Sequence, residues 1–158
     1  MDEITPFKKP EVSMEVGGPV DEARVTLALY GESLDPEEVS RRLGCAPTSA
    51  FRKGETRRPS GREGRPMPHG GWFLTVEGKA PVGVDELTSL LLNRFPKDEQ
   101  FWNELCREYR VQIRVAVHTG GWNRGFELMP TTTKLVALTG ATLGFDLYFY
   151  GDESDSPT

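Results

Sequence analysis

Four segments of the chain alternate apolar and polar residues, which is the pattern of a β-strand with one buried face. The most regular is 111–117, where Val111, Ile113, Val115 and Val117 alternate with polar or small residues. The others are 25–29, 72–76 and 143–149. Residues 48–53 form a less regular candidate strand, and 126–129 a short extended piece. The pattern therefore predicts a β-sheet with one polar face.

The first predicted strand runs directly into a helix with signals at both ends. Asp35 is a suitable N-cap, Pro36 follows at the first helical position, and Glu38 completes a capping box. Leu34 and Val39 have the spacing of a hydrophobic staple, and Gly44 is suited to the left-handed residue that ends a helix. Residues 23–44 therefore predict a strand followed by a helix.

Further helices follow from apolar residues repeated at intervals of three and four. Val84, Leu87, Leu91 and Phe95 form one such series, which Pro96 interrupts, and the series resumes at Phe101, Leu105 and Tyr109. The pattern predicts two short helices, or one helix broken at the proline. A last helix is predicted from Thr131, as its cap, through Leu138, ending at Gly140.

The order of these elements defines the expected fold class. It reads β-α-β-β-α-β, the order of a ferredoxin-like domain, extended by a further β-α-β. Alternating strands favour an α+β fold with a mainly antiparallel sheet and the helices packed on one face. We expect a flexible N-terminal arm over 1–22, one domain over 23–150 with a long exposed basic loop at 54–71, and a polar tail over 151–158.

Several short motifs occur in the same order as in a known family. The opening strand is followed by Gly31, Leu34-Asp35-Pro36-Glu37-Glu38, Leu43-Gly44, Pro47-Thr48, Arg52-Lys53-Gly54 and Trp72. On these residues the chain resembles the domain-of-unknown-function family numbered 4279, over about residues 23–150. The resemblance implies a bacterial or phage-associated domain, and it brings no activity, cofactor or catalytic residue. The segment 55–69 is longer than the corresponding loop of that family.

Charge and composition limit the partners and the cellular compartment that we expect for this protein. The chain of 158 residues has a formal net charge of −5, which argues against a general binder of nucleic acid or of anionic membranes. Its aliphatic runs, such as Leu90–Leu92, are too short to span a bilayer, and its first residues lack the apolar core of a secretory signal. Cys45 and Cys106 have no metal-type spacing. We expect a cytoplasmic protein with reduced thiols, a Cys45–Cys106 disulfide being the alternative.

Basic residues are concentrated in one segment. Residues 52–65 contain six basic side chains against two acids, a net charge of +4, which leaves −9 for the rest of a chain whose total is −5. Guanidinium groups here could bind an acidic protein surface or phosphates, or could simply be solvated. The candidate binding residues of this segment are Arg52, Arg57, Arg58, Arg62 and Arg65.

The polar face of the predicted sheet is a second candidate surface. If the apolar positions face the helices, the opposite face presents Arg114, His118, Asp146 and Tyr148, and also Tyr30 and Tyr150. Tyrosine beside arginine and histidine is typical of a recognition surface. An ordinary solvated face with an Arg114–Asp146 pair is the alternative. Trp72 and Trp122 each end a Gly-Gly-Trp triplet and complete the set of candidate binding residues.

The candidate catalytic groups are few. His69 and His118 have no partners at metal-ligand spacing, and the nucleophile and phosphate-binding motifs GxSxG, GxxxxGK[ST] and GxGxxG do not occur. We therefore expect no cofactor or metal, and a non-catalytic module that binds another protein, such as an immunity or antidote protein. The alternatives are a nucleic-acid-binding domain that uses the arginine-rich loop and an enzyme centred on His118, with Asp146 nearby.

Overall fold

The computed structural model describes residues 18–56, 64–121 and 123–151. The elements, in chain order, are β1 (Gly18–Pro19), β2 (Glu22–Gly31), α1 (Pro36–Leu43), β3 (Ser49–Phe51), β4 (Gly70–Lys79), α2 (Val84–Leu92), α3 (Glu99–Glu108), β5 (Arg110–Thr119), β6 (Arg124–Gly125), α4 (Pro130–Thr139) and β7 (Thr142–Phe149). The fold is therefore α+β, as the sequence predicts.

The main sheet has five strands in the order β3-β4-β2-β5-β7. The pairs β3–β4, β4–β2 and β2–β5 are antiparallel, whereas β7 runs parallel to β5. The short strands β1 and β6 form a separate parallel pair. The sheet is thus mixed but mainly antiparallel, and the parallel pairing follows from the α4 crossover that returns the chain to the same end of the sheet.

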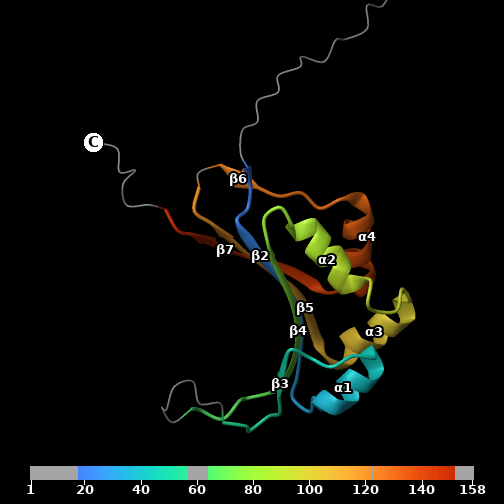
Figure 1. Ribbon diagram of the computed structural model, residues 1–158. Coiled ribbons are helices and arrows are strands. Elements are labelled where there is room, and N and C mark those ends of the chain that lie inside the picture. Colours follow the sequence, from blue (N-terminus) through green and yellow to red (C-terminus); the bar gives the residue numbers. More distant parts are fainter. Residues whose placement is uncertain (1–17, 57–63, 122, 152–158) are drawn as a thin grey trace, which may run out of the picture.

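All four helices of the described chain lie on one face of the sheet, and the other face is uncovered (Figure 1). The alternation in the central strands explains this arrangement. Val25, Leu27 and Leu29 of β2 and Ile113 and Val115 of β5 are completely buried beneath the helices. The expectation of helices on one face is confirmed.

The ends of α1 match the sequence signals at most positions. The Asp35 side chain accepts a hydrogen bond of 3.1 Å from the Glu37 N–H, and Gly44 ends the helix with a φ of 73°. Glu38 departs from the expected capping box, because its carboxylate pairs with Arg41 one turn later, at 2.6 Å. The ion pair replaces the reciprocal bond of the capping box at this helix start.

Two other predictions about helices have different outcomes. The expected break at Pro96 is present, since α2 ends at Leu92 and α3 begins at Glu99. The expected cap at Thr131 is wrong: the helix begins one residue earlier, at Pro130, and Met129 is its N-cap. Proline at the first helical position has no N–H to satisfy, and Met129 makes no side-chain capping hydrogen bond.

Strand boundaries also differ from the pattern-based ranges. β4 extends over ten residues, because glycines at its start and charged residues at its end complete the ladder with β2. β3 covers only three of the six residues expected. Residues 18–22, expected in the N-terminal arm, form β1 and the start of β2, while the rest of that arm and the tail beyond residue 151 lie outside the described residues.

β7 departs most from its expected burial. Its residues Phe145, Leu147 and Phe149 are on the helix side of the sheet, as the alternation predicts, but they are 46%, 73% and 53% exposed. The expectation that these residues are core is wrong. β7 is an edge strand, and β5 is its one neighbour in the sheet. Leu143, at its start, still packs against the core.

Two further expectations concern membrane-spanning segments and the state of the cysteines. Within the ranges that the structure describes, no helix combines the length and the apolar character needed to cross a membrane. Cys45 and Cys106 are both free and half-buried, as the main sequence expectation has it, so the disulfide alternative is wrong. Burial raises the pKa of both thiols above the ordinary value.

Candidate interaction face

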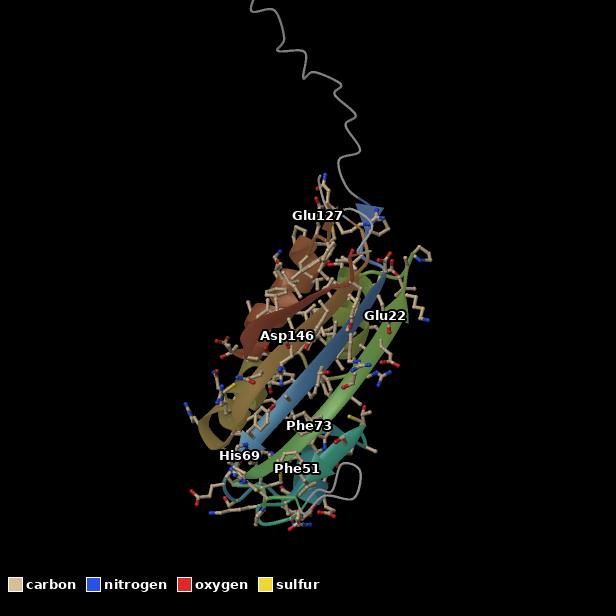
Figure 2. The ribbon with its side chains drawn as sticks, turned by 90° about the vertical axis from the view of Figure 1, so that its left-hand side faces the viewer. Glu22, Phe51, His69, Phe73, Glu127 and Asp146 are labelled. Carbon is tan, nitrogen blue, oxygen red and sulfur yellow. The ribbon has the colours of Figure 1, made fainter. Side chains whose placement is uncertain are left out.

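The uncovered face of the sheet, which we call the open face, brings together side chains from β2, β4, β5 and β7 (Figure 2). Register explains the gathering. Thr26 pairs with Thr75 on one side and Arg114 on the other, and His118 pairs with Tyr148. Residues paired across strands share a face, so the polar positions of the strands form one continuous surface. Phe73 and Asp146 are both visible on it in Figure 2.

One end of the open face carries an aromatic cluster. The Tyr30 ring meets the Phe73 ring edge to face, with centroids 5.3 Å apart, and the His69 ring in the same way at 5.5 Å. Phe51, from β3, lies 5.6 Å from Phe73. Gly71 is required beneath the Phe51 ring, because a Cβ at position 71 would lie 2.5 Å from that ring. The glycine therefore lets the two phenylalanine rings meet over the strand.

A second aromatic group is at the other end. The His118 ring stacks on Tyr148, with centroids 4.7 Å apart and an angle of 10° between the planes. It also stacks with Tyr150 at 5.7 Å, and His118 Nδ1 lies 3.1 Å from the Tyr150 hydroxyl. The two tyrosines are 46% and 62% exposed. Large, rigid side chains held at the surface are the groups that most often anchor a partner.

Charged side chains between the two aromatic groups are paired. Arg24 bonds Glu77 at 3.0 Å, and Arg114 bonds Asp146 at 3.2 Å. Hydrogen bonds to Tyr30 and to Asp146 raise the pKa of Arg114 above its ordinary value. The expected Arg114–Asp146 pair is therefore present. Because the charges are paired, the middle of the open face has no large net charge.

Two shallow depressions mark the open face. The larger, of about 650 Å³, is lined by Tyr30, His69, Arg110, Gln112 and Asp146 among others. The smaller, of about 400 Å³, lies between Phe51, Phe73, Arg114 and Tyr148. His118 is not among the residues lining either one. A surface of this shape can receive side chains of a partner, because aromatic walls and a few polar groups converge on each hollow.

The described part of the basic loop is a continuation of the sheet edge. The Gly54 N–H donates to the Met67 carbonyl at 2.8 Å, and the Met67 N–H donates to the Glu55 backbone carbonyl at 2.9 Å. Thr56 and Pro66 form an isolated antiparallel bridge. Arg52 bonds Asp35 at 2.9 Å and also pairs with Glu37, while Lys53 pairs with Glu32. These two basic residues therefore attach the base of the loop to the start of α1.

Of the remaining loop arginines, Arg65 lies in the described part of the chain, where it is exposed and precedes Pro66. Arg57, Arg58 and Arg62 lie outside the described residues, as does Trp122.

Trp72 is a correction to the set of candidate binding residues. It is fully buried on the helix side of β4, and its indole N–H donates to Ser40 Oγ at 3.0 Å. The alternation that puts Leu74 and Val76 in the core puts Trp72 there as well. A residue with no exposed surface cannot contact a partner, so its role is to pack α1 against the sheet.

The polar alternation of β2 puts Tyr30 on the open face, as the sequence predicts. Sequence reasoning missed two other residues of this face, Phe51 and Arg110. Phe51 and Arg110 carried no such signal, because β3 is short and weakly patterned and Arg110 precedes the regular part of its strand. The Arg110 guanidinium lies against the Gln112 amide at the rim of the larger depression.

The chemistry of the face is that of recognition groups. In the described ranges, no three histidine, cysteine or acidic side chains are close enough to hold a metal ion. The Asp146 carboxylate bonds Arg114, and His118 has Tyr150 as its hydrogen-bonding neighbour.

The chain matches a known protein family. A family model described as a domain of unknown function (DUF4279) matches residues 21–150. The chain belongs to this family. The DUF4279 match covers the chain from β2 to the end of β7, so it includes the whole five-stranded sheet and all the helices of the described chain, and it confirms the resemblance seen in the sequence motifs. Searches of curated proteins and of solved structures give no match to this chain.

Proposed function

We propose that this DUF4279 domain is a non-catalytic binding module that recognises another protein through the open face, with the basic loop beside it. The observation that carries the proposal is a sheet whose four described helices all lie on one side, leaving aromatic rings and arginines exposed on the other. Aromatic residues and arginine are enriched at protein interfaces relative to the rest of the protein surface.

The kind of partner follows from the composition of the face. Tyrosines and arginines are the residues enriched where proteins bind one another. The open face carries tyrosines at both ends, and arginines at the Tyr30 end and in its middle. The paired charges of Arg24 and Arg114 favour a partner with mixed polar and apolar groups over one of uniform charge. An immunity or antidote protein, which binds one cognate protein, would use such a surface, and we offer this as the narrower form of the proposal.

A ferredoxin-like arrangement is the finer description of fold that we propose. Its support is that β3, β4, β2 and β5 adjoin in that order and are antiparallel throughout. These strands occur in the chain as β-α-β-β-α-β if α2 and α3 are counted as one broken helix. We also propose a cytoplasmic location, which the two free thiols favour.

The experiment compares capture of partners by three forms of the full-length chain. Tagged wild type, the open-face variant Arg110→Glu/Tyr148→Ala and the helix-side variant Arg107→Glu are each incubated with extract of the native host and with the products of neighbouring genes. We expect a protein that wild type and Arg107→Glu retain equally and that the open-face variant loses. Equal retention by all three forms would contradict the proposal.

A single-stranded nucleic acid is the second candidate partner. The observation that favours it is the exposed His118–Tyr148–Tyr150 group on a sheet face, because bases stack on such rings. A labelled oligonucleotide of mixed sequence tests it by fluorescence anisotropy at low salt. Binding that weakens steeply with salt and with Tyr148→Ala would support this candidate, and no change in anisotropy would remove it.

A further inference from the structure

The outer edge of β7 is the largest exposed apolar feature of the described strands that the open face does not use. β7 is the last strand of the sheet, with β5 as its one neighbour there. On its helix side, Phe145 is 46% exposed even though Phe126 stacks on it, and Leu147 is 73% exposed. An edge strand with a row of apolar side chains is a template for pairing with another strand.

The two edges of the sheet differ in how they are protected. β3, at the opposite edge, is three residues long and leads directly into Arg52 and Lys53. β7 is eight residues long and contains no proline, lysine or arginine, and its one charged residue, Asp146, is bonded to Arg114. Short length, basic residues and prolines are the features by which proteins prevent edge pairing. β3 has the short length and the adjacent basic residues, whereas β7 has none of these three features.

We propose that β7 pairs antiparallel with β7 of a second copy of this chain, around a two-fold axis at Leu147. The backbone direction agrees with this pairing. The Tyr150 N–H donates to the Thr119 carbonyl of β5, and in a parallel ladder both backbone groups of alternate residues point to the same side. The backbone groups of Tyr148 and Asp146 therefore also point toward β5. Phe145 and Leu147 direct their N–H and C=O outward.

A second copy of β7 is a suitable partner for this edge because the side chains of two antiparallel β7 strands complement each other. In the register centred on Leu147, the two Leu147 side chains meet, and Phe145 lies opposite Phe149 on the helix side. On the open face, Asp146 lies opposite the Tyr148 hydroxyl, which can donate to it. Gly144 lies opposite Tyr150, whose ring can cover the glycine.

Charge selects this register over its neighbour. A register centred on Asp146 would bring two carboxylates directly opposite each other, which is destabilising. The register centred on Leu147 instead places Asp146 opposite the hydroxyl of Tyr148, so no like charges face each other. A two-fold axis makes the contact self-limiting, because each copy has one β7 and offers at its other edge only the three-residue β3, which Arg52 and Lys53 follow. The product is a dimer with one continuous ten-stranded sheet, twice the five of each copy.

The experiment measures the mass of the full-length protein by sedimentation across about a hundredfold range of concentration. We expect a reversible monomer–dimer equilibrium. Leu147→Lys, a change at a side chain 73% exposed, should raise the dimer dissociation constant at least about tenfold while the circular dichroism spectrum is unchanged. The matched control is Leu90→Lys on α2, where the replaced leucine is 55% exposed, and it should leave the dissociation constant as in wild type.

A cross-link tests the register. Two residues facing each other in a hydrogen-bonded antiparallel pair have Cα atoms about 5.5 Å apart, within the range of a disulfide. In a Cys45→Ser/Cys106→Ser background, Leu147→Cys should form a disulfide-linked dimer on mild oxidation, and Leu90→Cys should not. A monomer at every concentration, growth beyond dimers, or a dimer that Leu147→Lys leaves intact would each overturn the proposal. Equal cross-linking through position 90 would overturn it as well.

Discussion

Arg114 on β5 and Asp146 on β7 form an ion pair of 3.2 Å on the open face, at the seam where the last strand joins the sheet in parallel. The pair is diagonal, since Asp146 is registered with Ala116 rather than with Arg114 itself. About half of each side chain is exposed, 51% and 43%. The contact therefore joins two strands without burying either charge.

The first prediction is that this pair contributes little to stability. A double-mutant cycle of Arg114→Ala and Asp146→Ala should give a coupling free energy below about 1 kcal/mol, because water screens exposed charges. Urea unfolding of the four proteins measures it. The same Arg114→Ala change should weaken capture of a protein partner if the open face is the binding surface. A coupling of several kcal/mol would mean that the pair is structural.

The second prediction concerns the link between α1 and β4. Trp72→Ala should destabilise the protein by roughly 3–5 kcal/mol, because the cavity left by a fully buried indole is only partly refilled. Ser40→Ala should cost roughly 1–3 kcal/mol by leaving the indole N–H, now 3.0 Å from Ser40 Oγ, without its acceptor. Ser33→Ala, at an exposed loop position, is the matched control and should be neutral. Equal effects of the two serine changes would contradict the assignment.

The third prediction tests the end of α1. Gly44→Ala should destabilise the protein by about 1 kcal/mol, because the φ of 73° at this residue is a left-handed conformation that a side chain disfavours. No atom lies within 4 Å of a Cβ built there, so the loss is conformational rather than steric. Gly125→Ala, also with nothing within 4 Å and without a positive φ, is the control, and its midpoint of thermal unfolding should stay close to wild type.

The fourth prediction is a dependence of stability on alkaline pH. Burial raises the pKa of Cys45 and Cys106 in the folded state, so the folded protein holds these protons more tightly than the unfolded chain does. The resulting stability is present below the ordinary thiol pKa and is lost as the pH rises through the raised values. We expect the free energy of unfolding to fall over this alkaline range.

The control for the thiols is the Cys45→Ser/Cys106→Ser protein, whose stability should depend less on pH over the same range. Alkylation by iodoacetamide near neutral pH should be slower in the folded protein than in urea, because the thiolate is the reactive form. Faster alkylation of the folded protein would mean that a neighbouring group activates one of the thiols.

The local elements were predictable from the residues that make them. The cap at Asp35, the left-handed ends at Gly44 and Gly140, and the break at Pro96 each depend on one or two residues and their neighbours, and the structure has all of them. Where a local signal had a competitor, the prediction failed. Glu38 pairs with Arg41 instead of closing a capping box, and Pro130 starts the last helix before Thr131 can cap it.

The open face was partly predictable for the same reason. Period-two alternation assigns each residue of a strand to one of two faces, so the alternation alone groups Arg114, His118, Asp146 and Tyr148 on one face. Trp72 shows the limit of candidate selection by residue type, since its own alternation already assigned it to the core. Phe51 and His69 join the aromatic cluster only through the return of the loop to β4, which no local pattern encodes.

By itself, the sequence of this protein determined where the helices and the longer strands lie, where α1 and α4 end, and which side of each longer strand is apolar, because these properties depend on near neighbours. Only the tertiary structure decided the order of the strands, and with it the exposure of β7. Phe145 and Leu147 carry the same apolar alternation as Val115 and Val117, their register partners on β5, yet the valines are buried and the β7 residues are exposed. The difference is the number of neighbours: a central strand has one on each side, and β7 has one.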